Sequence, residues 1–208
     1  MPVNEGSNWN QHWAIVGRFG SLYEKVQQQQ SDMYVRLLLG KKLGKNSKIL
    51  EIGGGTGGLS TRLARHFGSS GTIVDNSVEA KRYFDAHFSK SGIHYRLMDA
   101  FDLKDKEKFD VVFSDGLIEH FVKDVQKDLI RAHVQAAKKD GCIILVVPKT
   151  SWRYAIFSNV MKITGFWNFG FERPYSLQEL TALCEKNGLV VEKDDESMWE
   201  VAVRCRKK

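Results

Sequence analysis

Residues 48–60, Lys-Ile-Leu-Glu-Ile-Gly-Gly-Gly-Thr-Gly-Gly-Leu-Ser, decide the fold of this chain. The first five form a short apolar run with β-branched side chains, which predicts a buried strand. Five of the next six residues are glycine, so the chain makes a tight turn whose backbone can closely approach a ligand. Apolar residues four apart, Leu59, Leu63 and Phe67, predict a helix that ends at Gly68. A strand, a glycine turn and a helix N-terminus in this order are typical of a nucleotide-binding crevice.

Two cofactor classes use such a turn. Gly53, Gly55 and Gly58 satisfy the pattern G-x-G-x-x-G of dinucleotide-binding proteins. With Glu51 and Gly57, the same turn also satisfies acidic-x-G-x-G-x-G, and here the chain resembles the class I S-adenosylmethionine (SAM)-dependent methyltransferases. A carboxylate at the strand end would repel a pyrophosphate but can help to hold the amino group of SAM. The resemblance implies SAM as cofactor, bound at the turn by Glu51, Gly53, Gly54, Gly55 and Gly57.

Acidic residues follow the next strands at the positions that this cofactor needs. Residues 71–75 predict a second strand, and Asp75 at its end stands where a carboxylate accepts hydrogen bonds from ribose hydroxyls. Ser77 is expected to cap the following helix. A third strand over residues 94–97 leads to Asp99, which matches the family's acceptor of the adenine amino group. The resemblance completes the cofactor-binding set with Asn76, Asp99, Ala100, Ser114 and Asp115.

The candidate catalytic residues follow a fourth predicted strand, Phe109–Ser114. The turn after it contains Leu117-Ile118-Glu119-His120, which resembles a leucine-glutamate-histidine segment of small-molecule methyltransferases. A general base is needed only if the attacking atom carries a proton at working pH. Histidine titrates near neutral pH, so His120 is the candidate base, with Asp115 and Glu119 close in sequence. The alternative is that His120 is a polar wall of the cofactor pocket.

The remaining elements complete an α/β fold. Cys142–Pro148 is nearly all apolar, as a central parallel strand covered on both faces should be. Residues 176–179 form a capping box that begins a helix. Residues 189–194 and 198–205 predict a terminal antiparallel hairpin, which is characteristic of class I methyltransferases. We therefore expect a seven-stranded, mostly parallel, doubly wound sheet with a C-terminal antiparallel hairpin.

The chain divides into an N-terminal segment and a cofactor domain. Residues 46–208 are the predicted SAM-binding methyltransferase domain. Residues 1–45 predict helices, broken near the glutamine run 27–30, that act as a lid on the substrate side. Trp9, Trp13 and Tyr23 are the lid candidates, and the alternative is that these aromatic residues cover a sheet edge.

A second aromatic segment lies within the cofactor domain, at about residues 150–175. Its aromatic residues are interleaved with charges: Trp152, Tyr154, Phe157, Phe166, Trp167, Phe169, Phe171 and Tyr175. This composition predicts a segment that encloses a small organic substrate. An amphipathic helix that covers the sheet edge is the alternative.

Composition limits the partners of this 208-residue chain. Its net charge of +6 arises from 31 basic and 25 acidic residues, so nucleic-acid binding is permitted but not favoured. Three widely spaced cysteines show no metal-ligand spacing and indicate reduced thiols in a cytoplasmic protein. No apolar run approaches the ~20 residues of a membrane span, so no membrane partner is expected.

Methyl transfer to a small molecule is the function that these patterns predict, and three alternatives stay open. An RNA or protein methyltransferase fits the modest basic charge. A non-catalytic protein that retains a SAM site is possible because alignment catalysis leaves no obligatory catalytic residue. An NAD-dependent oxidoreductase would share the glycines and Asp75 but leaves Glu51, Asp99 and the terminal hairpin unexplained.

Overall fold

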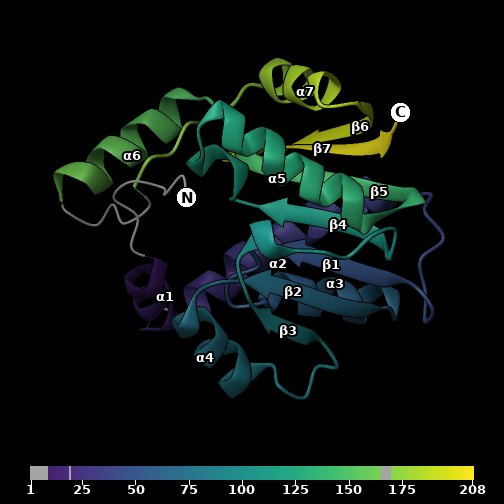
Figure 1. The fold of residues 1–208 in the computed structure, drawn as a ribbon. Coiled ribbons are helices and arrows are strands. Elements are labelled where there is room, and N and C mark those ends of the chain that lie inside the picture. Colours follow the sequence, from purple (N-terminus) through teal and green to yellow (C-terminus); the bar gives the residue numbers. More distant parts are fainter. Residues whose placement is uncertain (1–8, 19, 165–169) are drawn as a thin grey trace.

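The computed structural model describes residues 9–18, 20–164 and 170–208; the side chains of residues 14–18, 20–27 and 29 lie outside this description. A seven-stranded sheet runs through the centre in the order β3-β2-β1-β4-β5-β7-β6 (Figure 1). The strands are β1 Lys48–Ile52, β2 Ser70–Asp75, β3 His94–Leu97, β4 Phe109–Asp115, β5 Ala137–Pro148, β6 Leu189–Glu196 and β7 Glu200–Lys207.

Strand direction confirms the expected fold class. β1 to β5 pair in parallel, and β7 is antiparallel to both β5 and β6. The parallel pairing puts the carboxyl ends of β1, β2 and β4 at one edge of the sheet. The residues that follow these strands therefore share one end of the molecule.

Helices cover both faces of the sheet. They are α1 Trp9–Arg18, α2 Gly20–Leu38, α3 Gly58–Phe67, α4 Val78–His87, α5 Lys123–Ala136, α6 Trp152–Ile163 and α7 Leu177–Lys186, with short 3₁₀ turns at Ala100–Asp102 and Ile118–His120. α5 and α7 pack on one face, whereas α2 and α3 pack on the other. Alternate residues of the central strands enter the two cores, which is why these strands are mainly apolar.

The local signals of the sequence are confirmed. Gly68 ends α3 in the left-handed conformation, and Ser77 caps α4 by accepting a hydrogen bond from the Ala80 N–H. Ser176 and Glu179 form the capping box of α7. All three cysteines are buried and unpaired. Of the helices in the described ranges, none is sufficiently long and apolar to cross a membrane.

Two expectations about element limits are wrong. α2 continues through Gln27–Gln30 without a break, because glutamine is a good helix former and nothing there interrupts the backbone ladder. β5 begins at Ala137 rather than Cys142, since its early residues pair with β4 across a register shift. Of the aromatic candidates, Phe166, Trp167 and Phe169 lie outside the described residues, as does the side chain of Tyr23.

The conformation of Gly68 predicts a stability difference between two glycines. A Cβ at Gly68 or at Gly44 would meet no atom within 4 Å, but only Gly68 has a positive φ, of 62°. We expect Gly68→Ala to lower the free energy of unfolding by about 1–2 kcal/mol relative to Gly44→Ala, because an L side chain disfavours the left-handed region. Urea unfolding of both variants measures this difference, and equal stability would contradict it.

Candidate active site

The glycine turn is held to the end of β2 by its own backbone. The Gly53 N–H donates to the Val74 carbonyl at 2.8 Å, and the Gly55 N–H donates to Asp75 Oδ2 at 2.8 Å. Gly53, Gly55 and Gly57 all have positive φ, which explains why the turn uses glycine. Without Cβ atoms, the backbone of the turn can be approached closely by whatever packs on it.

Side chains of α1 cover the turn. A Cβ added to Gly55 would lie 2.2 Å from Trp13 Cζ2, so the indole packs directly on the glycine backbone. The Ser77 hydroxyl donates to Asn10 Oδ1 at 2.8 Å. Sequence reasoning selected Trp13 for its aromatic character, but only the fold brings it to Gly55.

The carboxylate of Asp75 organises the chain on both sides of it. Besides accepting from Gly55, it accepts from the Ser77 N–H at 2.8 Å through Oδ1. Burial raises the pKa of this carboxyl group. Asn76, the next residue, is exposed. The Met98 N–H donates to the Asp75 carbonyl at 2.9 Å. This contact brings the Asp99 loop next to Asp75.

Asp99 and Ala100 lie at the start of a 3₁₀ turn. Asp99 Oδ1 accepts from the Phe101 N–H at 3.0 Å and so caps the turn. Both residues are partly exposed, and Phe101 beside them is 39% exposed. The Asp99 loop is thus held by a local hydrogen bond. Part of its surface is exposed at the edge of the sheet where Asp75 also lies.

Glu51 is buried within β1, two residues before the first glycine of the turn. Its carboxylate accepts from the Ser60 hydroxyl of α3 at 2.6 Å. Burial raises the pKa of Glu51 to about 8, although the Ser60 hydrogen bond opposes this shift. A carboxyl group so far from water favours a cationic neighbour.

More acidic groups gather at the end of β4. Gln30 of α2 donates to Asp115 Oδ1 at 3.2 Å and to Glu200 Oε1 at 2.8 Å. Burial, followed by the charges of Glu200, Glu51 and Glu119, raises the pKa of Asp115. The adjacent Ser114 has a buried hydroxyl without a hydrogen-bond partner. The sequence offered no signal for Gln30 or Glu200, which come from opposite ends of the chain.

His120 is enclosed by two carboxyl groups and an indole. Its Nδ1 lies 3.0 Å from the Phe171 carbonyl, which can only accept, so Nδ1 carries the proton. Its Nε2 lies 3.7 Å from Glu119 Oε1 and 3.6 Å from Glu172 Oε2. The Trp9 ring meets the imidazole edge-on, with centroids 4.9 Å apart.

Electrostatics around His120 follow from its burial. Burial raises the pKa of Glu172 to about 7. Burial, together with the charge of Glu172, raises the pKa of Glu119. Both Glu119 oxygens are buried without a hydrogen-bond partner. The structure therefore brings the three candidate catalytic residues together and adds Glu172, which sequence reasoning did not single out.

The arrangement fits the cofactor that the sequence implies. Glu51, Asp75 and Asp115 meet at one edge, and partnerless buried atoms lie beside them at Thr56 Oγ1, Ser114 Oγ and Asp115 Oδ2. Buried carboxyl groups attract a sulfonium or ammonium group and repel a pyrophosphate. This donor set fits SAM better than a nicotinamide dinucleotide.

Comparisons with known proteins agree with this geometry. Residues 49–141 match a family described as "Methyltransferase domain". The ubiquinone biosynthesis O-methyltransferase of Pelagibacter ubique is 30% identical over 159 residues, which are 73% of this chain and 65% of that protein. The chain resembles the class I SAM-dependent methyltransferases in sequence and in fold. It spans somewhat less than two thirds of the length of this relative.

Solved structures of class I methyltransferases share the fold. Magnesium protoporphyrin IX methyltransferase from Synechocystis, solved with S-adenosylhomocysteine, aligns with a TM-score of 0.66 and 17% identity, over 87% of this chain and 83% of that one. Geranyl diphosphate C-methyltransferase from Streptomyces coelicolor aligns with a TM-score of 0.69 and 16% identity, over 88% and 80%.

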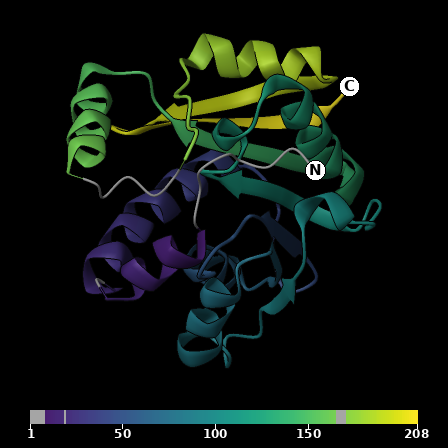
Figure 2. The same ribbon diagram turned by 60° about the vertical axis from the view of Figure 1, so that its left-hand side comes forward.

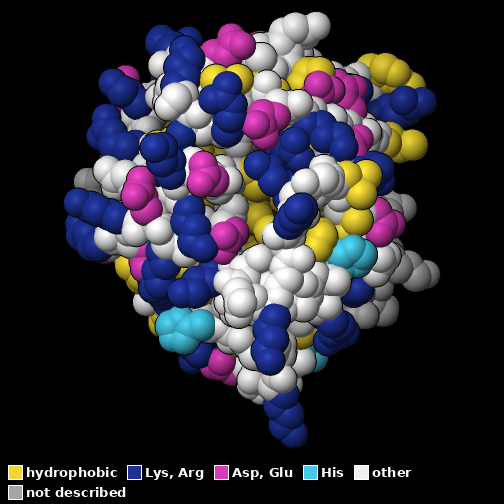
Figure 3. All heavy atoms as spheres, turned by 90° about the vertical axis from the view of Figure 1, so that its right-hand side faces the viewer, with side chains coloured by type: hydrophobic (Ala, Val, Ile, Leu, Met, Phe, Trp, Pro, Cys, Tyr) yellow, Lys and Arg dark blue, Asp and Glu magenta, His cyan; other side chains and the backbone are white. Residues whose placement is uncertain are grey.

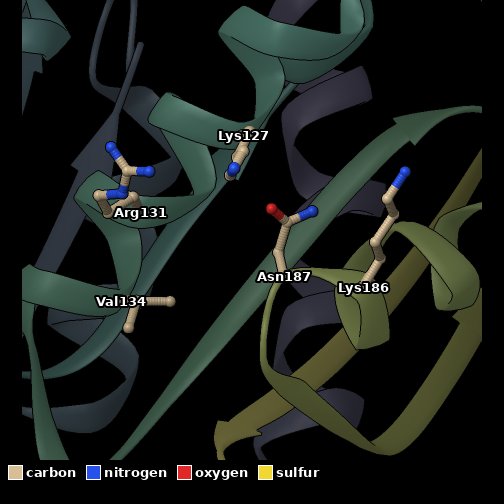
Figure 4. Close-up of a pocket in the computed structure, with 5 residues that line it drawn as sticks. All are labelled: Lys127, Arg131, Val134, Lys186 and Asn187. Atoms are coloured by element: carbon tan, nitrogen blue, oxygen red, sulfur yellow. The ribbon is translucent and has the colours of Figure 1, made fainter.

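Two surface pockets lie away from these residues. One, of about 230 Å³, lies between α5 and the end of α7 and is lined by Lys127, Arg131, Val134, Lys186 and Asn187 (Figure 4). The other, of about 500 Å³, is near the C-terminus and includes Lys41, Asp140 and Glu192. Seen from the end opposite the glycine turn, basic side chains are mixed with acidic ones (Figure 3). This surface does not form a broad basic field.

The buried carboxyl group of Glu51 predicts a pH effect on stability. Its pKa rises from 4.5 to about 8 on folding, so the folded protein holds the proton more tightly between these values. The stabilisation that this bound proton gives is complete below about pH 4.5. It is lost progressively as the pH rises from there through 8. In Glu51→Gln, we expect the fall in unfolding free energy from pH 5 to pH 8 to be smaller by roughly 1–3 kcal/mol.

Urea unfolding at the two pH values measures this effect. The matched control is Glu185→Gln, which changes an exposed glutamate of α7. A native-like pH dependence in Glu51→Gln would show that Glu51 ionises normally in the folded protein.

Proposed function

We propose that this methyltransferase transfers the methyl group of SAM to a nucleophilic atom of a small organic molecule. The observation that carries the proposal is the meeting of Glu51, Asp75 and Asp115 at the carboxyl ends of three neighbouring parallel strands. SAM supplies an activated methyl group, so the protein mainly aligns the nucleophile and excludes water. The relative from Pelagibacter, named as an O-methyltransferase of ubiquinone biosynthesis, supports a small-molecule acceptor.

The glycine turn and its neighbours are the proposed cofactor site. Asp75 would accept from the ribose, and Asp99 with Ala100 would hold the adenine. Glu51 and Asp115 would favour the cationic end. The supporting residues are Gly53, Gly54, Gly55, Gly57, Asn76 and Ser114, which line the same edge. Since Trp13 packs on Gly55, the Trp13 side chain must move aside or stack on the cofactor when the cofactor binds to the turn.

His120 is the proposed general base, with a hydroxyl oxygen as the favoured acceptor. Its Nδ1–H is fixed by the Phe171 carbonyl, so Nε2 takes the proton. Glu119 and Glu172, within 3.7 Å of Nε2, would stabilise the imidazolium that results. Asp115 lies close enough to Glu119 for the charge of Glu119 to raise its pKa.

The N-terminal segment is proposed as the lid over the acceptor. Trp9 contacts His120, Asn10 contacts Ser77 and Trp13 contacts Gly55, so α1 touches the glycine turn, the cap of α4 and the candidate base. Covering by these side chains would exclude water from the reacting atoms.

We also propose a cytoplasmic location, which the three thiols led us to expect.

Asp75→Ala should weaken binding of S-adenosylhomocysteine. Loss of a charged hydrogen-bond acceptor costs about 1.5–3 kcal/mol, which is roughly 10- to 150-fold in affinity. Calorimetry measures the change, with Asp85→Ala as control, because Asp85 is exposed on α4 and pairs with Lys81. Unchanged affinity in a folded Asp75→Ala protein would place the ribose contact elsewhere.

A labelled-SAM screen tests the activity itself. The protein is incubated separately with a metabolite mixture, total RNA and a protein extract, and label is expected only in a small molecule. His120→Asn should then lower kcat by about 10²–10⁴-fold while leaving S-adenosylhomocysteine affinity unchanged. His94→Asn, an exposed histidine on β3, is the matched control.

Other outcomes would contradict parts of the proposal. Label in RNA alone, falling steeply with salt, would replace the small-molecule acceptor by a nucleic acid. Cofactor binding without transfer to any fraction would favour a non-catalytic protein. Full turnover after deletion of residues 1–18 would remove the lid role of α1.

A further inference from the structure

Helix α6 turns its apolar side toward solvent. Its exposed large side chains are Trp152 (66% exposed), Ile156 (57%), Phe157 (42%), Val160 (52%) and Ile163 (86%). Trp152, Ile156, Val160 and Ile163 are spaced by four, four and three residues, so they form one stripe. The side that faces the protein buries Tyr154 and Ser158. This is the reverse of an ordinary surface helix, whose apolar stripe faces the core.

The exposed surface extends onto the turn between β6 and β7. Met198 is 58% exposed and Trp199 is 43% exposed. The rings of Phe157 and Trp199 lie 5.8 Å apart, and the Trp199 carbonyl accepts from the Lys149 N–H at 2.7 Å. The apolar surface is therefore continuous between the two elements and anchored to the sheet. Figures 1 and 2 both show α6 standing off the sheet at one end of the molecule.

The charges on α6 are all positive. Its sequence contains Arg153 and Lys162 and no acidic residue. The Arg153 guanidinium lies over the Trp152 ring, 4.7 Å from its centroid. The nearby Glu196 is paired with Lys149. Tryptophan and phenylalanine together with basic residues are typical of helices that lie in the headgroup region of a bilayer.

We propose that α6, together with Met198 and Trp199, docks on the surface of an anionic phospholipid bilayer. With 12 residues the helix is about 18 Å long, too short to span a bilayer, so it would lie in the interface plane. Basic side chains then meet anionic headgroups while the stripe enters the acyl boundary. The absence of a long apolar run, which led us to expect no membrane partner, does not oppose this mode of binding.

The docked orientation has a consequence for the site. The chain that follows α6 returns to Phe171 and Glu172, which contact His120. The bilayer would thus lie on the side of the molecule that holds the proposed acceptor pocket. The docking itself does not depend on methyl transfer, because it is measured without turnover.

Vesicle flotation of the full chain tests the proposal. We expect the protein to float with phosphatidylcholine vesicles that contain phosphatidylglycerol. The double variant Ile156→Glu/Ile163→Glu should lower this binding about 10-fold or more, since two apolar side chains no longer leave water. Leu39→Glu is the control, because this apolar side chain is 62% exposed and follows the end of α2. Circular dichroism and S-adenosylhomocysteine binding verify that the variants are folded.

A second pair of variants tests the charge. Arg153→Gln/Lys162→Gln should weaken binding to anionic vesicles by about 5-fold per residue and leave weak binding to pure phosphatidylcholine unchanged. The control Lys127→Gln/Lys186→Gln removes two cations at the pocket of Figure 4 and should bind as the native chain does.

Three results would overturn the docking. The first is that the native chain binds neither kind of vesicle, and the second is that Ile156→Glu/Ile163→Glu binds as the native chain does. Alternatively, sedimentation velocity could show a dimer that this variant abolishes, without vesicle binding. In that case the surface joins two copies of the chain. Failure of the labelled-SAM screen alone would leave the docking untouched.

Discussion

Parallel pairing of β1 with β2 and with β4 is the constraint on which the site depends. It brings three strand ends to one edge, so that Glu51, Asp75 and Asp115 gather although they are separated by 24 and 40 positions in the sequence. The Gly55–Asp75 hydrogen bond then fixes the glycine turn to the second strand. Without this pairing, each acid would be an ordinary residue at the end of a strand.

Gathering acids away from water has an electrostatic cost. Burial raises the pKa of Glu51, Asp115, Glu119 and Glu172, and several of these groups raise one another's pKa further. Such a cluster destabilises the folded protein as pH rises, and a bound cationic cofactor would favour the ionised form of its carboxyl groups. Stability and proposed function therefore make opposite demands on the same residues.

The two ends of the chain meet at this cluster. Gln30 from α2 bridges Asp115 and Glu200, and α1 places Trp9 against His120. Elements before and after the glycine turn thus complete the same cluster. α6 differs from them, since its apolar stripe faces solvent at the same end of the molecule. A common position for pocket and exposed helix would couple substrate access to surface docking.

The sequence by itself determined the features that depend on neighbouring residues. β1, α3 and the cap residues Gly68 and Ser77 follow from local propensity and backbone conformation, and the motif acids follow from their spacing. Alternating helices and strands then left few sheet topologies open, so the fold class was predictable.

Only the tertiary structure decided which distant residues meet. Glu172, Gln30 and Glu200 join the acidic cluster through contacts between elements far apart in the chain, which no local pattern encodes. The continuous α2 shows the same limit, because the glutamine run has no intrinsic reason to end a helix. The outward stripe of α6 is likewise a matter of orientation. Periodicity defines an apolar face, but packing determines whether that face meets the core or the solvent.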